Sequence, residues 1–116
     1  MFGKNAAEDF LHEIPTLPET EFCIYGTVHA HPEHADALEK AYEQTTRIAL
    51  TEPGCVYYCL TRDEQEPHIF YFFERYRGRK AFEEHVVGPF QEEIQRYILG
   101  VKAKFGRAIL PAPESK

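Results

Sequence analysis

The sequence of 116 residues has no tryptophan, one methionine and three cysteines. It also has no apolar run that approaches the roughly 20 residues of a membrane-spanning helix. Met1 to Lys4 are not followed by the apolar core of a signal peptide. Three cysteines cannot all pair, and Cys55 and Cys59 on one strand would share a face about 13 Å apart, too far for a disulfide. We therefore expect a reducing, cytoplasmic setting.

Several functional motifs are missing as well. There is no G-x-S-x-G, no phosphate-binding loop, no dinucleotide fingerprint and no C-x-x-C. The net charge of −6 opposes binding to a phosphate backbone. His29, His31 and His34 are close in sequence, but no carboxylate or cysteine completes a metal-binding set, which favours a surface cluster. We expect no metal, no cofactor, no nucleic acid and no membrane partner.

What the chain does have is an aromatic stretch over residues 68–76, in a composition of 43% hydrophobic and 28% charged residues. Aromatic and β-branched residues favour a strand, whose side chains alternate between two faces. Both faces are largely apolar, so we expect a central strand with cover on each side. One face carries Phe70, Phe72, Glu74 and Tyr76, and the other carries Ile69, Tyr71, Phe73 and Arg75.

The rest of the chain predicts strands and helices around this stretch. Strands are expected over 22–30, 55–61 and 101–109, because aromatic, β-branched or alternating apolar residues concentrate there. A helix is expected from Pro32 to the Pro53-Gly54 stop, with one apolar stripe. A second helical segment over 79–98 is expected to break at Gly88-Pro89 and to end at Gly100.

This order, β-α-β-β-α-β, predicts an α+β, ferredoxin-like fold with a four-stranded antiparallel sheet. We assign residues 1–21 to an N-terminal arm or disordered tail, residues 22–110 to one domain and residues 111–116 to a C-terminal tail. The helices cover only one face of such a sheet. Because soluble monomers rarely expose a large apolar patch, we expect a homodimer that packs sheet against sheet.

Residue types also suggest a functional site beside the aromatic stretch over residues 68–76. Glu74 and Tyr76 share a strand face with two phenylalanines, and His85 falls on the inner stripe of the following helix. A carboxylate, a phenol and an imidazole around an apolar cavity can abstract a proton. The structural alternatives are that Glu74 pairs with Arg77 or Arg79, that His85 only bonds at a helix end, and that Tyr76 only caps the core.

Three segments together resemble the antibiotic biosynthesis monooxygenase family, whose motifs read approximately E-P-G-C-x-x-Y, E-x-W and A-x-x-x-H. The segments here are Glu52-Pro53-Gly54-Cys55-Val56-Tyr57-Tyr58, Phe73-Glu74-Arg75-Tyr76 and Ala81-Phe82-Glu83-Glu84-His85. The likeness covers residues 22–109. It implies a dimeric α+β barrel with a ligand cavity between sheet and helices.

The resemblance also implies a reaction. Relatives include quinol and anthrone monooxygenases that use neither metal nor flavin: the enzyme helps to deprotonate a phenolic substrate, whose anion reduces O₂. Carried onto this chain, His85 is the base with Glu74 as second choice, and Tyr76 replaces the family's tryptophan as hydrogen-bond donor. The substrate-binding residues would be Phe70, Phe72, Phe82 and Tyr58.

The chain departs from the family in having no tryptophan, and its one asparagine is Asn5, in the arm. The heme-degrading branch needs asparagine, tryptophan and histidine, so two of its three parts are missing. The expectation is therefore a cofactor-independent monooxygenase that converts a small quinol or anthrone-type substrate to a quinone. The alternatives are an isomerase, cyclase or lyase that shuttles protons, and a non-catalytic ligand-binding or stress-response barrel.

Overall fold

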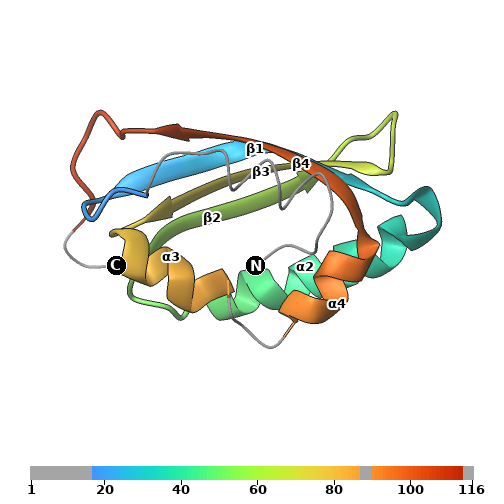
Figure 1. Cartoon of the computed structure of the whole chain (residues 1–116), viewed down its shortest axis with the longest axis horizontal. Helices are drawn as coiled ribbons and strands as arrows, with labels where there is room; N and C mark the ends of the chain where they lie inside the picture. Colours follow the sequence, from blue (N-terminus) through green and yellow to red (C-terminus); the bar gives the residue numbers. More distant parts are fainter. Residues whose placement is uncertain (1–16, 87–89, 114–116) are drawn as a thin grey trace.

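A computed structural model describes residues 17–86 and 90–113. Figure 1 shows a layer of helices lying along one face of a sheet. In chain order the elements are β1 (Phe22–Ala30), η1 (Pro32–His34), α2 (Ala35–Ala49), β2 (Cys55–Arg62), β3 (Ile69–Tyr76), α3 (Arg79–Val86), α4 (Gln91–Tyr97) and β4 (Ile98–Gly106).

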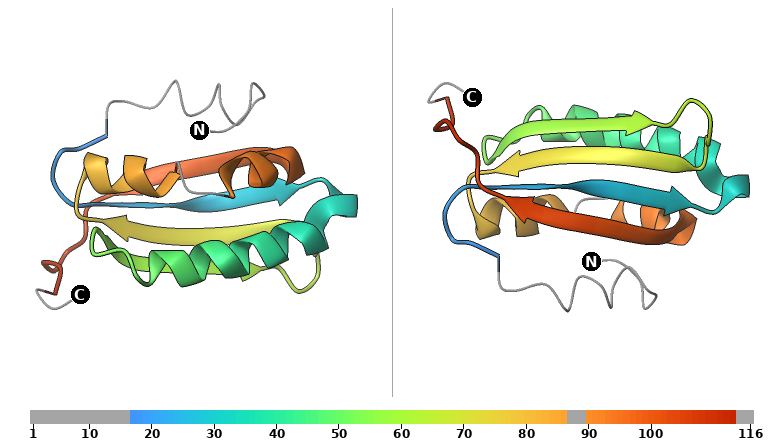
Figure 2. Two further views of the ribbon diagram at one scale, coloured as in Figure 1. Left: turned by 90° about the horizontal axis from the view of Figure 1, so that it is seen from below. Right: turned by 90° about the horizontal axis from the view of Figure 1, so that it is seen from above.

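The sheet has the strand order β2-β3-β1-β4, and all three pairings are antiparallel. The right-hand view of Figure 2 shows the four strands in this order on the face without helices. The α+β, ferredoxin-like β-α-β-β-α-β fold is thus confirmed, with β1 and the aromatic strand β3 at its centre.

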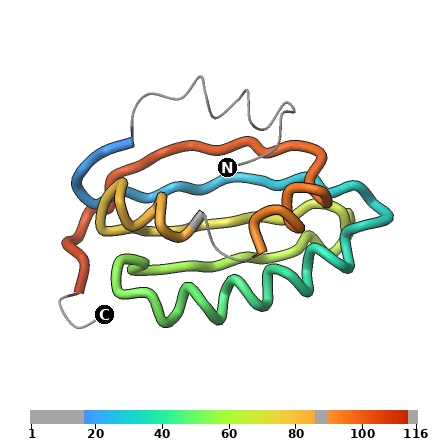
Figure 3. The backbone as a smooth tube through the Cα atoms, turned by 60° about the horizontal axis from the view of Figure 1, so that its bottom comes forward, coloured from blue at the N-terminus to red at the C-terminus, as the bar shows by residue number. Residues whose placement is uncertain are grey.

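The three longer helices divide the covered face between them. Figure 3 shows α2 along the β2 side, while α3 and α4 follow one another over the other half. The predicted stripe of α2 faces the sheet, with Leu38, Ala41 and Ala49 buried. A 3₁₀ turn over 32–34 precedes α2, so the α-helix begins three residues after Pro32. Among the described helices, none is long and apolar enough to cross a membrane.

A β-bulge interrupts β2 at Val56. Cys55 lies opposite Tyr76, but Tyr57 lies opposite Arg75, so one extra residue is inserted between the two pairs. The expectation that Cys55 and Cys59 share a face is therefore wrong. Cys55 is buried on the helix side, whereas Cys59 lies opposite Phe73 on the uncovered side.

The start and end of β4 also differ from expectation. Tyr97 ends α4, and the strand begins at Ile98 and passes through Gly100, which was expected to end the helix. A register shift beside Ile98 puts both Ile98 and Val101 in the core, and the four-residue spacing of the buried Ile94 and Ile98 imitated a helical stripe. The strand stops at Gly106, not at Ile109, because its last pairing with β1 is at Cys23.

Gly26 allows β1 to lie close to β4. A methyl group at this position would overlap the carbonyl oxygen of Lys102. A glycine in mid-strand thus marks a close approach of the neighbouring backbone.

Three arginines at alternate positions hold both ends of the described chain. Arg75 pairs with Glu21 and also donates to the carbonyl of Leu110 (2.6 Å). Arg77 donates to the carbonyl of Pro113 (2.8 Å). Arg79 forms an ion pair with Glu19 and donates its backbone N–H to the Pro18 carbonyl (3.0 Å).

The described parts of both tails are thus attached to the domain. Residues 1–16 of the expected arm, residues 114–116 of the expected tail and the Gly88-Pro89 break lie outside the described residues.

The uncovered face of the sheet carries large aromatic side chains. Tyr25, Tyr57, Tyr71 and Phe73 expose 37%, 52%, 42% and 41% of their surface. The ring of Phe73 stacks on Tyr25 at 5.8 Å between centroids and meets the edge of Tyr57 at 5.9 Å. These four residues are called the open aromatic face below.

Candidate active site

A cavity of about 190 Å³ lies between the sheet and the helices. Its wall is mostly apolar, with the polar groups contributed by a few side chains from β2, β3, the three longer helices and the turn after α2. The lining residues are Ile24, Val28, Tyr42, Thr45, Ile48, Glu52, Tyr58, Leu60, Phe72, Glu74, Phe82, His85, Phe90, Gln91, Ile94, Val101 and Ala103. An apolar pocket with a few convergent polar groups is typical of a small-molecule site.

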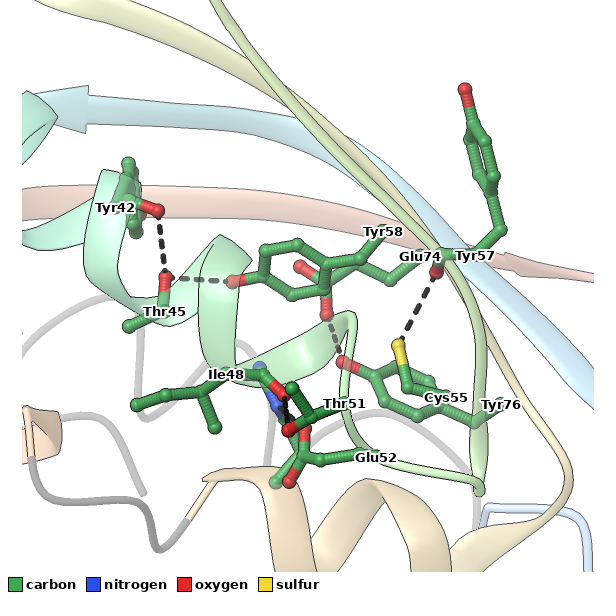
Figure 4. Close-up of polar contacts among 11 residues, drawn as sticks. Tyr42, Thr45, Ile48, Thr51, Glu52, Cys55, Tyr57, Tyr58, Glu74 and Tyr76 are labelled. Atoms are coloured by element: carbon green, nitrogen blue, oxygen red, sulfur yellow. Dashed lines mark hydrogen bonds and ion pairs between the residues drawn. The ribbon is translucent and has the colours of Figure 1, made fainter. Parts of the chain in front are cut away.

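Glu74 provides a carboxyl group on the wall formed by β3. Its Oε1 accepts the hydroxyl hydrogen of Tyr76, which follows two residues later on the same strand face (Figure 4). Burial raises the pKa of Glu74, while the Tyr76 hydrogen bond and the nearby His85 lower it. Because burial is the largest cause, the carboxyl keeps its proton to a higher pH than an exposed glutamate.

His85 enters the cavity from α3. Its Nδ1 lies 2.7 Å from Glu52 Oε1, and the two side chains expose 12% and 30% of their surface. The imidazole ring also packs against the rings of Tyr58 (4.9 Å between centroids) and Tyr76 (5.7 Å).

Hydroxyl groups from β2 and α2 complete the polar part of the wall. The hydroxyls of Tyr58 and Thr45 lie 3.1 Å apart, and Thr45 also donates to the Tyr42 carbonyl (3.1 Å), as Figure 4 shows. Burial and the nearby Glu74 raise the pKa of Tyr42, Tyr58 and Tyr76. These phenols therefore stay neutral hydrogen-bond donors.

The structure brings five of the seven predicted site residues to one cavity: His85, Glu74, Phe72, Phe82 and Tyr58. The other two, Tyr76 and Phe70, are not among the lining residues. Tyr76 is completely buried behind Glu74, and Phe70 packs on Tyr42 at 5.6 Å and under Arg62.

The structural alternatives can also be compared with the geometry. Glu74 bonds to Tyr76 and not to Arg77 or Arg79, which hold the chain ends. Tyr76 does pack in the core, and its hydroxyl bonds to Glu74. The large aromatic residues leave a cavity, so they do not fill the space between sheet and helices.

Four polar residues of the site were not predicted from the sequence: Glu52, Tyr42, Thr45 and Gln91. Tyr42 and Thr45 lie on the helix that was expected to carry one apolar stripe, and hydroxyl groups in such a stripe are a signal for a polar cavity wall. Glu52 belongs to a motif that supported the resemblance, but its partner His85 is 33 residues away in sequence.

The histidines of the first strand and turn lie elsewhere. The rings of His31 and His34 are 6.1 Å apart, and His34 packs on Tyr97. Within residues 17–86 and 90–113, no group of three or more histidine, cysteine, aspartate or glutamate side chains is placed to hold a metal ion.

The sequence profile described as antibiotic biosynthesis monooxygenase matches residues 21–97. This range contains β1 to α4 and every polar residue of the cavity wall. The match therefore covers every helix and strand except β4, together with all the polar groups of the cavity wall.

Individual relatives are less informative about function. An uncharacterised Synechocystis protein, sll1783, is 32% identical over 94 residues, which are 73% of this chain and 62% of the relative. The chain thus spans less than two thirds of that protein's length.

Among solved structures, PA3566 from Pseudomonas aeruginosa has a TM-score of 0.68 at 27% identity and covers 78% of this chain and 96% of its own. A candidate antibiotic biosynthesis monooxygenase from Bacteroides thetaiotaomicron has a TM-score of 0.72 at 14% identity, covering 84% of this chain and 98% of its own. At 14% identity the latter supports the fold alone.

Proposed function

The chain belongs to the antibiotic biosynthesis monooxygenase family, and we propose that it oxidises a small quinol or anthrone-type phenol with O₂. The observation that carries the proposal is the placement of Glu74 and His85 on one apolar cavity. An apolar wall strengthens the electrostatic effect of each polar group on a bound aromatic ring.

In the first step, His85 accepts the phenolic proton of the substrate. The buried carboxyl of Glu74, when it holds its proton, donates a hydrogen bond to an oxygen of the resulting anion. Tyr76 acts on the substrate through Glu74, because its own hydroxyl is bonded to that carboxyl. A donor aimed at developing negative charge is the main way in which such sites lower a barrier.

In the second step, the electron-rich anion reduces O₂ by one electron, and the two radicals combine to form a carbon–oxygen bond. The peroxide takes a proton from His85. The same carbon then loses its remaining hydrogen as a proton, the O–O bond breaks, and water leaves. Counted from the phenol, one C–OH, one C–H and one O₂ thus become two carbonyl groups and one water. The reducing electrons come from the substrate.

The test is oxygen consumption by metal-depleted protein with a panel of anthrones and hydroquinones. The wild-type protein is expected to consume one O₂ for each substrate and to form the quinone. His85→Ala is expected to lower kcat/KM by roughly 10²- to 10⁴-fold, the usual range for a general base. Gln44→Ala, on the exposed side of α2, is the control. No uptake with any substrate, or equal uptake by the His85 variant, would contradict the proposal.

A second candidate function uses the same groups without oxygen. Two carboxyls, one bonded to a phenol and one to an imidazole, line the cavity and can act as an acid and a base on opposite ends of a substrate. An isomerase, cyclase or lyase of this kind would turn over under strict anaerobiosis, whereas the monooxygenase would not.

We also propose that the working form is a homodimer that buries the open aromatic face. The four aromatic residues of this face lie on the side of the sheet that no described helix covers. A second copy of the same sheet is an apolar partner of matching shape.

A further inference from the structure

We propose that Glu52 is the positioning residue of the site: its carboxylate holds His85 as the Nδ1–H tautomer, so that Nε2 is the basic nitrogen. The role of Nε2 in a reaction rests on the proposed function, whereas the tautomer is a property of the protein alone. Neither Glu52 nor its turn was assigned a function by the sequence.

The contact itself is direct. Glu52 Oε1 lies 2.7 Å from Nδ1, a distance typical of a charge-assisted hydrogen bond. A carboxylate can only accept, so Nδ1 must carry the hydrogen. In a neutral imidazole the other nitrogen then has the lone pair, and Nε2 becomes the acceptor.

Two tyrosine rings pack against the imidazole, in addition to the contact at Nδ1. Tyr58 packs against it at 61° between ring planes and Tyr76 at 46°, with centroids at 4.9 Å and 5.7 Å. The ring exposes 12% of its side-chain surface. With Nδ1 directed at Glu52 and two rings beside it, the imidazole has a fixed orientation in the cavity wall.

The turn that carries Glu52 is itself fixed. The backbone N–H of Glu52 donates to the Ala49 carbonyl (3.1 Å), and the Glu52 carbonyl accepts from Cys55 (3.1 Å). The Pro53 and Gly54 carbonyls accept from the Arg77 side chain (3.1 Å) and backbone (2.9 Å).

Gly54 lets this turn lie against the helix that carries His85. A Cβ atom at Gly54 would lie 2.6 Å from the Cβ of Ala81, one turn before His85 on α3. The absence of a side chain at Gly54 therefore permits the close approach of the two segments. The Glu52-Pro53-Gly54 turn thus provides both the acceptor for Nδ1 and the packing that brings it within reach.

Once His85 accepts a proton, the carboxylate has a second effect. The imidazolium then forms an ion pair with Glu52 inside a largely apolar wall. This stabilises the charged intermediate through His85. The arrangement matches the general use of a carboxylate to orient a catalytic imidazole.

The test is ¹⁵N NMR of the His85 ring in the substrate-free protein, at a pH where the ring is neutral. The wild-type protein is expected to show Nδ1 protonated. Glu52→Leu is expected to move the equilibrium toward the Nε2–H form, and Glu52→Gln, which keeps an acceptor, to retain part of the Nδ1–H form. Glu84→Leu, beside His85 on the exposed side of α3, is the matched control. An Nε2–H ring in the wild-type protein, or an unchanged spectrum in Glu52→Leu, would overturn the proposal.

Activity provides a second readout if a substrate is found. Glu52→Leu is expected to lower kcat on the order of 10- to 100-fold with little change in KM, since loss of a supporting partner typically costs that much. The kcat of Glu52→Gln is expected to lie between those of Glu52→Leu and the wild-type protein. If no substrate turns over, the NMR result still decides the role of Glu52, and only the proposed oxidation fails.

Discussion

The carboxyl of Glu74 accepts a hydrogen bond from Tyr76, and the two residues lie on the same face of one strand. Tyr76 is completely buried, whereas Glu74 reaches the cavity. Tyr76 therefore lowers the pKa of the Glu74 carboxyl without lining the cavity itself.

Tyr76→Phe tests this relationship. Because the hydrogen bond lowers the pKa of Glu74, its loss is expected to raise that pKa further. Loss of the buried hydrogen bond is also expected to reduce the free energy of unfolding by about 1 kcal/mol. Carboxyl ¹³C NMR over a pH series measures the first effect and chemical denaturation the second. Tyr57→Phe, on the open aromatic face, is the control, and an equal Glu74 pKa in both variants would refute the link.

Glu74 should also make stability depend on pH. Its folded pKa lies above its usual value of 4.5, so the stabilisation by the protonated form is complete below about pH 4.5 and is lost as the pH rises through the folded pKa. Glu74→Gln removes this loss. The melting temperature of the variant relative to the wild type is therefore expected to increase as the pH rises from about 4 to about 8. Thermal melts over a pH series measure this difference, with Glu84→Gln at an exposed position as the reference variant. A difference that did not change with pH would mean that the pKa of Glu74 is not perturbed.

The open aromatic face predicts the assembly state. Phe73 lies between Tyr25 and Tyr57, so Phe73→Glu places a charge at the centre of the proposed interface. The wild-type protein is expected to sediment as a dimer and the variant as a monomer, because a buried unpaired charge is strongly unfavourable. Gln44→Glu makes the same change of charge on the exposed side of α2. A monomeric wild-type protein would exclude this dimer.

Gly54 and Ala81 form a steric pair that a double-mutant cycle can measure. Gly54 does not have a positive φ, so Gly54→Ala adds only the clash with Ala81. We expect a loss of about 1–3 kcal/mol for this overpacking. Ala81→Gly alone is expected to cost about 1 kcal/mol of helix propensity.

The double variant Gly54→Ala/Ala81→Gly should be more stable than the sum of the two single effects. A favourable coupling of about 0.5–3 kcal/mol in denaturation experiments is expected for residues in contact. Strict additivity would mean that the turn and α3 do not meet as described.

The fold could be predicted because its signals are local. The 68–76 stretch is confirmed as a central strand and the single stripe of α2 as the buried side of that helix, although two apolar strand faces did not indicate which one the helices cover. The two bulges could not be predicted. A bulge is not visible in the composition of a strand, so Cys55 and Cys59 were placed on one face and Ile98 in the wrong element.

The site could be predicted only in part, for a similar reason. Glu74 and His85 were recognisable because each is a polar residue in an otherwise apolar pattern. The two patterns belong to consecutive elements, β3 and α3. Glu52 was not, because its role depends on a contact across 33 residues and on a glycine that permits it. Tyr76 was expected to contact the substrate, but Glu74 lines the cavity and Tyr76 does not. Assigning both residues to one strand face does not specify which of the two reaches the cavity.

The bulge at Val56 gives β2 two alternation phases within eight residues. Before it, Cys55 faces the helices; after it, Tyr58 does, and Tyr57 points to the other side of the sheet (Figure 4). If Val56 instead paired in regular register with β3, simple alternation would exchange the two adjacent tyrosines between the cavity and the open aromatic face. A single backbone insertion therefore decides which phenol serves the ligand and which serves the outer surface.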